Sequence, residues 1–129
     1  MALGILLDSS VVIAHLRGKF DIASQVPTAE PLFLSLTALG ELYKGVLKSG
    51  SPAKNQAALD VFLKTVAVLH PDTATALQYA QIACDLESKG TPIPENDIWI
   101  AAVALECSIP LATRDAHFER VAGLTILKW

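Results

Sequence analysis

Four acidic side chains occupy positions where they could meet and carry out metal-assisted chemistry. Asp8 and Asp115 each follow a short apolar run. Glu41 lies one turn inside a predicted helix, and Asp97 falls in the first turn of another. If the four carboxylates converge, their mutual repulsion must raise their pKa values or be neutralised by a divalent cation. Oxygen ligands with no Cys or His nearby select magnesium or manganese over zinc, and such an ion can activate water for attack on a phosphodiester. The pattern therefore predicts a metal-dependent nuclease.

Each acid also has a purely structural interpretation, because Asp is common in the first turn of a helix and directly after a strand. For Asp97 or Asp115 alone, capping is the more frequent role. A protein in which every acid is a cap would show no specific effect of divalent ions on its stability. The nuclease hypothesis therefore depends on the convergence of all four acids.

The helix that carries Asp97 is the most strongly specified element of the chain. Pro92 and Pro94 pre-set the backbone for a helix start, and Asp97 then falls where free N–H groups and the helix dipole favour an anion. Residues 98–105 are apolar on nearly every side, which is typical of a buried helix. The acidic end of such a helix must open onto a cleft or find polar partners.

Short apolar strands alternate with helices along the whole chain. The predicted strands span residues 3–7, 32–34, 66–69, 109–113 and 124–127. The other predicted helices span residues 11–16, 20–26, 35 or 37 to 48, 57–65, 72 or 73 to 89, and 116–121. This pattern predicts one domain, residues 1–129, with a three-layer α/β/α sandwich around a central, mainly parallel sheet. Because the carboxyl ends of parallel strands form the ligand edge, Asp8 and Asp115 should face the same edge.

The composition is unusually apolar. Hydrophobic residues make up 52% of the 129 residues, and the mean hydropathy is +0.43. This favours an apolar surface that a second subunit or a partner covers. Two helices are predicted to bury an apolar stripe: Leu36, Leu39, Leu42, Tyr43, Val46 and Leu47 on the first, and Ala57, Ala58, Val61, Phe62 and Thr65 on the second.

No apolar run approaches the roughly 18 residues of a membrane-spanning helix, and the amino terminus lacks a basic region. We therefore expect no signal peptide, no membrane span and a cytoplasmic protein. Cys84 and Cys107 are expected to be buried free thiols. His15, His70 and His117 lack the spacing of a zinc site, so a structural role is expected for each.

The chain resembles the PIN domains, and more narrowly the VapC toxins of type II toxin–antitoxin systems, over its whole length. The marks of the resemblance are LLDSSVVIA at 6–14, LTALGELYKG at 36–45, IPENDIWIAA at 93–102 and TRDAHF at 113–118. Four acidic motifs in the family's order are a specific signal, whereas a lone Asp-Ser-Ser would be weak.

This resemblance implies a metal-dependent endoribonuclease that acts on RNA, with the four acids as its catalytic tetrad. Asp8 and Asp97 are then the safest direct ligands of Mg²⁺ or Mn²⁺, while Asp115 and Glu41 act directly or through metal-bound water. Thr113 matches the family's hydroxyl residue before the last acid and is expected to hold a carboxylate or a water. Further residues have lesser expected roles: Ser10 and Asn96 as hydrogen-bonding neighbours or simple helix caps, and Arg17, Lys19, Lys44, Lys48 and Arg114 as RNA phosphate contacts.

The resemblance also implies a homodimer and a VapB-like antitoxin whose tail blocks the cleft. The net charge of −3 gives no global attraction to nucleic acid, so RNA binding needs a local basic surface.

Other functions remain open from the residues alone. A phosphatase that uses an aspartyl intermediate needs a second Asp two residues after the first, where this chain has Ser10. A structure-specific DNA nuclease generally carries extra helical elements, for which 129 residues leave little room. A module that binds RNA or a partner without cutting it is the main alternative from another class. Retention of all four acidic positions favours catalysis over that alternative.

Overall fold

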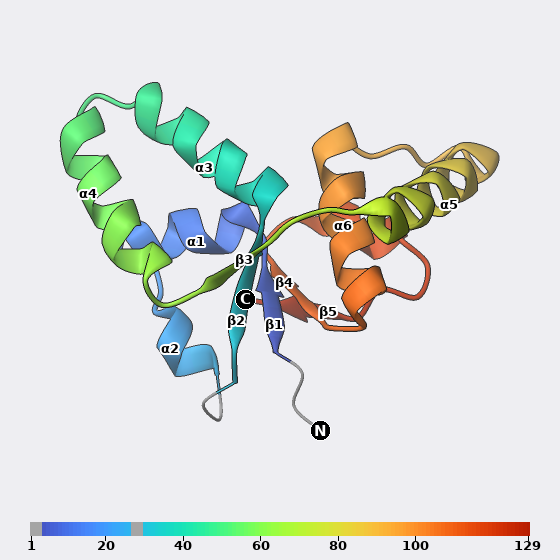
Figure 1. The fold of residues 1–129 in the computed structure, drawn as a ribbon, viewed down its shortest axis with the longest axis horizontal. Helices are drawn as coiled ribbons and strands as arrows, with labels where there is room; N and C mark the ends of the chain where they lie inside the picture. The colour runs from blue at the N-terminus through green and yellow to red at the C-terminus, as the bar shows by residue number, and fades with distance from the viewer. Residues whose placement is uncertain (1–3, 27–29) are drawn as a thin grey trace.

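The computed structural model describes residues 4–26 and 30–129, and a five-stranded parallel sheet forms its centre (Figure 1). The strands are β1 (Ile5–Leu7), β2 (Leu32–Ser35), β3 (Ala67–Leu69), β4 (Leu111–Thr113) and β5 (Ile126–Lys128). Their order is β3-β2-β1-β4-β5, and every neighbouring pair is parallel. The chain thus builds outward from β1 to β3 and then returns to add β4 on the other side of β1. A topological switch point lies between β1 and β4, where ligands of such sheets bind.

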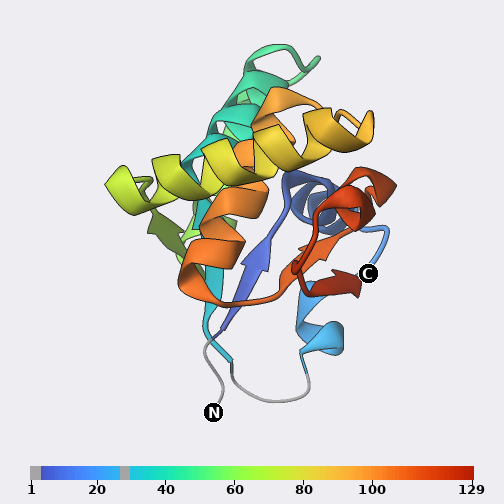
Figure 2. The ribbon, with the colours of Figure 1, turned by 90° about the vertical axis from the view of Figure 1, so that its right-hand side faces the viewer.

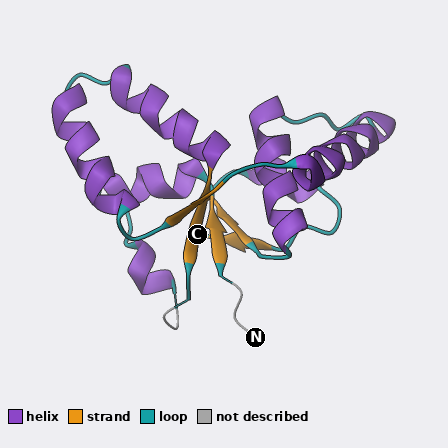
Figure 3. Cartoon of the chain, in the orientation of Figure 1, coloured by secondary structure: helices purple, strands orange, loops and turns teal. Residues whose placement is uncertain are grey.

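Helices cover both faces of this sheet, so the predicted three-layer α/β/α sandwich is confirmed (Figure 3). On one side lie α1 (Ser9–Leu16), α2 (Ile22–Gln25), α3 (Leu36–Leu47) and α4 (Pro52–Leu63). On the other side α5 (Thr73–Lys89) packs across α6 (Glu95–Cys107), as Figure 2 shows. The predicted helix at 116–121 is a short 3₁₀ helix, η1 (Ala116–Arg120).

Local capping signals place the ends of α3 and α5 where the sequence predicts them, whereas α4 begins at Pro52, five residues before its predicted start. Ser35, one of two candidate caps, accepts a hydrogen bond from the Ala38 N–H at 3.1 Å and starts α3. Asp72 forms a reciprocal capping box with Thr75 at the start of α5. Gly90 ends α5 with φ +68°, a left-handed conformation that favours glycine. The predicted first strand began at residue 3, which lies outside the described residues.

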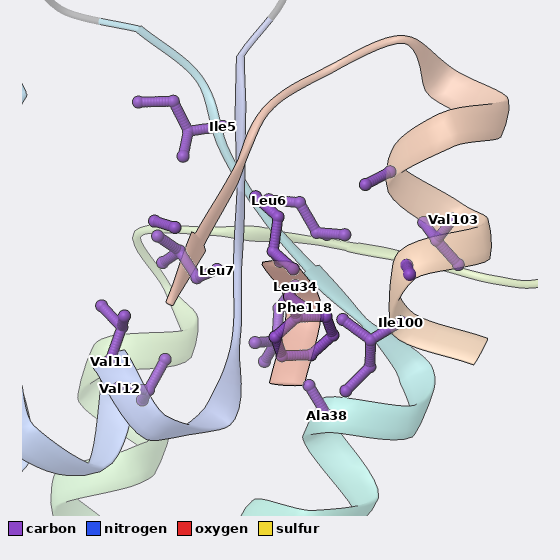
Figure 4. Packing of buried hydrophobic residues seen from close by; sticks show 14 of the residues in the cluster. Ile5, Leu6, Leu7, Val11, Val12, Leu34, Ala38, Ile100, Val103 and Phe118 are labelled. Carbon is purple, nitrogen blue, oxygen red and sulfur yellow. The ribbon is translucent and has the colours of Figure 1, made fainter. Parts of the chain in front are cut away.

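The core lies on both sides of the two central strands (Figure 4). Leu6, Leu7 and Leu111 are fully buried, so these strands show no polar face. The predicted burial of α6 is confirmed, because its residues from Ile100 to Ala104 are all buried. Phe118 in η1 is also fully buried and ties this short helix to the core. The elements that surround the switch point are therefore held by one continuous hydrophobic cluster.

The predicted apolar stripes are wrong for several positions. On α3, Leu36 is 43% exposed and Leu47 is 76% exposed, whereas the predicted burial of Leu42 and Val46 is confirmed. The helix also buries Ala38, which is not among the predicted residues. Ala38, Leu42 and Val46 follow one another at intervals of four positions, so they form one narrow face of the helix. Only that face meets the core. The exposed members of the two predicted stripes are Leu36, Tyr43, Leu47, Ala57, Ala58, Val61 and Thr65.

The prediction that both thiols are buried is also wrong, since Cys84 and Cys107 are exposed free cysteines. Cys84 lies on the outer face of α5, and Cys107 is the last residue of α6, where the helix leaves the core. In the part of the chain that the structure describes, no helix is long and apolar enough to span a membrane.

Candidate active site

The sheet topology brings the first and last acids together. Leu7 pairs with Ala112 across β1 and β4, and the Asp8 N–H donates to the Ala112 carbonyl at 2.9 Å. Asp8 therefore leaves the carboxyl end of β1 beside the end of β4, which leads directly to Asp115. Asp8 is only 3% exposed, so its charge depends on the polar groups that surround it.

Two hydroxyl groups hold one oxygen of Asp8. Oδ2 accepts hydrogen bonds from Ser10 Oγ at 2.6 Å and from Thr113 Oγ1 at 2.8 Å. The same hydroxyls accept from the backbone: Arg114 N–H donates to Ser10 and Asp115 N–H donates to Thr113. Ser10 and Thr113 thus orient the Asp8 carboxylate through Oδ2, whereas among the described side chains none donates to the other oxygen, Oδ1.

Asp97 and Asp115 meet at one imidazole nitrogen. His117 Nδ1 lies 3.2 Å from Asp97 Oδ2 and 3.0 Å from Asp115 Oδ1. The His117 backbone N–H also donates to Asp115 Oδ1 at 3.0 Å, which caps η1. These contacts join the start of α6 to the segment that follows β4.

The electrostatics of Asp97 indicate that the other three acids lie near it. The pKa of Asp97 is raised from 3.8 to about 6, and burial of the carboxyl is the largest cause. The negative charges of Asp8, Asp115 and Glu41 contribute to the same rise, whereas the hydrogen bond with His117 opposes it. The predicted convergence is therefore seen in the structure, and it is an arrangement that a divalent cation would relieve.

Glu41 reaches the site from α3. Ser9 Oγ donates to Glu41 Oε1 at 2.9 Å, and Asn96 Nδ2 lies 3.5 Å from Oε2, at the limit of a hydrogen bond. Asn96 thus contacts Glu41. Because Ser9 begins α1 and Asn96 lies in the first turn of α6, the Glu41 carboxylate joins the starts of these two helices. Glu41 is half-buried, so water can reach it.

Two hollows border acids of the site. One, of about 290 Å³, is lined in part by Asp115, Arg114, Lys128 and Trp129. The other, of about 170 Å³, is lined in part by Glu41 and by residues of α1, α3 and α4.

The predicted phosphate contacts divide into two groups. Arg114 lies over the Phe20 ring at 5.2 Å and borders the larger hollow, while Arg17 borders the smaller one. Lys19, Lys44 and Lys48 are exposed, and none forms an ion pair with the four acids within residues 4–26 and 30–129.

The sequence interpretation missed that His117 lies beside the acids. The expectation of oxygen ligands with no histidine nearby is wrong, because one ligand atom each from Asp97, Asp115 and His117 lies within 4.8 Å of the others. The Asp-Ala-His spacing was the available signal, since a capping Asp bonds the backbone two residues later and brings that side chain back toward itself. The structural expectation holds for His15, which accepts a hydrogen bond from the Ile22 N–H.

The residues fit a divalent cation. Carboxylate oxygens and an imidazole nitrogen are all metal ligands, and the ligand atoms of Asp97, Asp115 and His117 lie within the reach of one ion. Asp8 faces the same cluster with one oxygen held by hydroxyl groups. A cation bound by these groups would place positive charge among the acids.

Comparisons with known proteins agree with this arrangement. The family model of the PIN domain matches residues 5–124. The chain is 30% identical to Ribonuclease VapC1 of Haemophilus influenzae over 96% of each chain. It is 32% identical to the tRNA(fMet)-specific endonuclease VapC of Salmonella typhimurium, over 89% of this chain and 84% of that protein. A solved structure, VapBC2 from Rickettsia felis bound to a DNA fragment from their promoter, matches with a TM-score of 0.91 and 26% identity over 97% and 98% of the two chains.

The parallel sheet with acids at its switch point thus defines a PIN-type nuclease fold. The chain belongs to the PIN-domain family and, within it, to the VapC ribonucleases, so it is an endoribonuclease of the VapC toxin class.

Proposed function

We propose that this chain cuts RNA at a site where Asp8, Asp97, Asp115 and Glu41 hold Mg²⁺ or Mn²⁺, with residues 1–129 acting as one domain. The observation that carries the proposal is the convergence of the four carboxylates on Asp97, whose pKa they and its burial raise to about 6. Carboxylates kept this close without a cation repel one another, so the arrangement favours a site that works with one.

A bound divalent ion would supply charge stabilisation at the phosphate and an activated water. Asp8 and Asp97 are the best candidates for direct ligands, because both are buried and their orientations are fixed by hydrogen bonds. Asp115 and Glu41 act directly or through water, and Glu41 is held by Ser9 from the neighbouring helix. Ser10 and Thr113 keep Asp8 in one orientation.

Arg114 is the best candidate for a phosphate contact. It borders the larger hollow next to Asp115, and its guanidinium lies on the Phe20 ring, which limits its freedom. Arg17 borders the hollow on the other side. We expect these two side chains to contact RNA more than the exposed lysines, because cations next to the acids offset their repulsion of the substrate backbone.

We also propose that a VapB-like antitoxin binds this chain and that the chain forms a homodimer in the cytoplasm. Solved relatives from Rickettsia felis, Haemophilus influenzae and Salmonella typhimurium are VapBC assemblies. Exposed apolar side chains on α1, α3 and α4 offer a surface for a partner; we call this the outer helical face, and it comprises Ile13, Leu16, Leu36, Tyr43, Leu47 and Val61. Its two α1 residues, Ile13 and Leu16, line the hollow that Glu41 borders, so a bound segment there would also obstruct that side of the site.

The test is cleavage of a mixed pool of structured RNAs by the purified chain, with EDTA and then Mg²⁺ or Mn²⁺ added back. The pool should include initiator tRNA, because one relative is specific for tRNA(fMet). Asp97→Asn is the test variant. Asp60→Asn, on an exposed residue of α4, is the matched control. Because Asp97→Asn is purified in the same way, cutting that persists in it reveals a contaminating ribonuclease.

We expect cutting that requires the metal and that disappears only in Asp97→Asn, with both variants folded. Equal cutting by all three proteins would contradict the proposed site. Metal-dependent RNA binding without cutting, by wild type and Asp60→Asn alike, would instead favour the non-catalytic binding module.

A further inference from the structure

We propose that His117 is a nitrogen ligand of the metal ion and that it makes this site prefer Mn²⁺ to Mg²⁺. The inference rests on the proposed function, in which Asp97 and Asp115 hold a divalent ion. The observation is that His117 Nδ1 lies against one oxygen of each acid, at 3.2 Å and 3.0 Å.

These distances match the spacing of neighbouring ligands around an ion. Two adjacent ligand atoms of an octahedral ion with bonds of about 2.1 Å lie about 3 Å apart. The Nδ1 atom has this spacing from both carboxylate oxygens, and all three ligand atoms lie within 4.8 Å of one another. An ion could therefore be held by the three atoms with only small side-chain movements.

The backbone of His117 is fixed on both sides of the ring's attachment point. The His117 N–H donates to Asp115 Oδ1, and the next residue, Phe118, is fully buried. The imidazole itself is 41% exposed, so burial of the ring does not explain its orientation. Its side-chain contacts in this cluster are the two acids, and these lie on the side where an ion would bind.

The chemistry of the nitrogen predicts the metal preference. Carboxylate and water oxygens suit Mg²⁺ and Mn²⁺ alike, whereas an imidazole nitrogen favours the transition metal. When His117 binds an ion through Nδ1, its ring proton lies on Nε2. The competing explanation is that His117 only hydrogen-bonds the two acids when no ion is bound. In that case a bound ion displaces the imidazole from the acids, and substitution of His117 should not lower the metal affinity.

His117→Asn separates the two explanations. The Asn side chain reaches about as far as Nδ1, keeps an N–H donor for the acids and offers the ion only an oxygen. His70→Asn is the matched control, because His70 is an exposed residue at the end of β3. His117→Ala is a second variant that offers no ligand, and Asp97→Asn removes an acid. Binding of Mn²⁺ and of Mg²⁺ is measured by calorimetry, and pulsed electron paramagnetic resonance of bound Mn²⁺ detects a directly bound ¹⁴N.

We expect His117→Asn to weaken Mn²⁺ binding about tenfold and Mg²⁺ binding less than about threefold. The ¹⁴N signal should be present in wild type and in His70→Asn, and absent in both His117 variants. The proposal is overturned if wild type lacks the ¹⁴N signal, if His117→Asn leaves Mn²⁺ affinity unchanged or raises it, or if it weakens both metals equally.

The outcome also separates this inference from the proposed function. If neither metal binds wild type, the metal site itself fails. If both metals bind, and Asp97→Asn abolishes binding while the His117 variants do not weaken it, only the inference about His117 fails.

Discussion

The hydroxyl group of Thr113 donates to Oδ2 of Asp8 across 105 positions of sequence, and this bond joins the ends of the two central strands. Both residues are almost fully buried, at 2% and 3% exposure. The bond therefore contributes to the stability of the fold and also orients an acid of the site.

Thr113→Val tests this double role. Valine keeps the shape but removes the donor to Asp8 and the acceptor for the Asp115 N–H. We expect the free energy of unfolding to fall by about 1–3 kcal/mol, because buried polar atoms lose partners. We also expect weaker metal binding, since Asp8 loses one of the two contacts that orient it. Urea unfolding and calorimetry measure the two effects. Thr125→Val, at an exposed threonine, is the control and should change neither.

Asp97→Asn should stabilise the metal-free protein at neutral pH. The folded pKa of Asp97, about 6, lies above the ordinary value of 3.8, so the folded state binds the proton more tightly than the unfolded state. Ionisation of Asp97 therefore costs stability progressively as pH rises from about 4 to about 6. Asparagine avoids this cost and should gain up to about 3 kcal/mol at pH 7.5 and little at pH 4. Urea unfolding in EDTA at both pH values measures this, and an equal gain at both pH values would contradict it.

Cleavage should rise with pH through the titration of Asp97. Metal binding needs the ionised carboxylate, and a group with a pKa of about 6 is largely protonated at pH 5. Because the ion competes with the proton, a higher Mn²⁺ concentration should move the midpoint of the profile to lower pH. Initial cleavage rates from pH 5 to 8 at two Mn²⁺ concentrations test this. A midpoint that does not move with the metal would indicate that a different group controls the rate.

Leu47→Ser should weaken antitoxin binding without harming the fold. Leu47 is 76% exposed on the outer helical face, so serine removes apolar surface that the folded chain does not bury. Burial of one leucine by a partner is worth about 1.5–3 kcal/mol, so we expect a loss of at least about tenfold in affinity. The measurement is binding of a co-expressed small partner protein.

Leu77→Ser is the control for the antitoxin experiment. Leu77 is 61% exposed on α5, on the other side of the sheet. If the two substitutions weaken antitoxin binding equally, the outer helical face is not the specific docking surface.

The sequence predicts the elements well because their signals are local. Capping by Ser35 and Asp72, and the glycine that ends α5, depend on neighbouring residues and could be read directly. The shared edge of Asp8 and Asp115 follows from their places after apolar strands. The strand order, which puts β1 beside β4 and creates the switch point, depends on packing between distant segments and carries no local signal.

The wrong predictions also concern contacts between distant segments. Leu47 and Val61 lie on apolar patterns that suit a core stripe, but a helix buries only the face that meets its neighbours. His117 lacks any regular spacing to a second histidine, so its approach to Asp97, 20 positions earlier, becomes visible only in three dimensions.

The shortness of the central strands has a consequence for genetic screens. β1 and β4 have three residues each, so core residues lie directly next to the site. The fully buried Leu7 precedes Asp8, and the fully buried Ala112 precedes Thr113, which bonds Asp8. A small shift in core packing at these positions would move an acid of the site. A selection for harmless variants of this toxin should therefore recover apolar-to-apolar changes at Leu7 and Ala112 alongside changes of the acids, in proteins that remain folded.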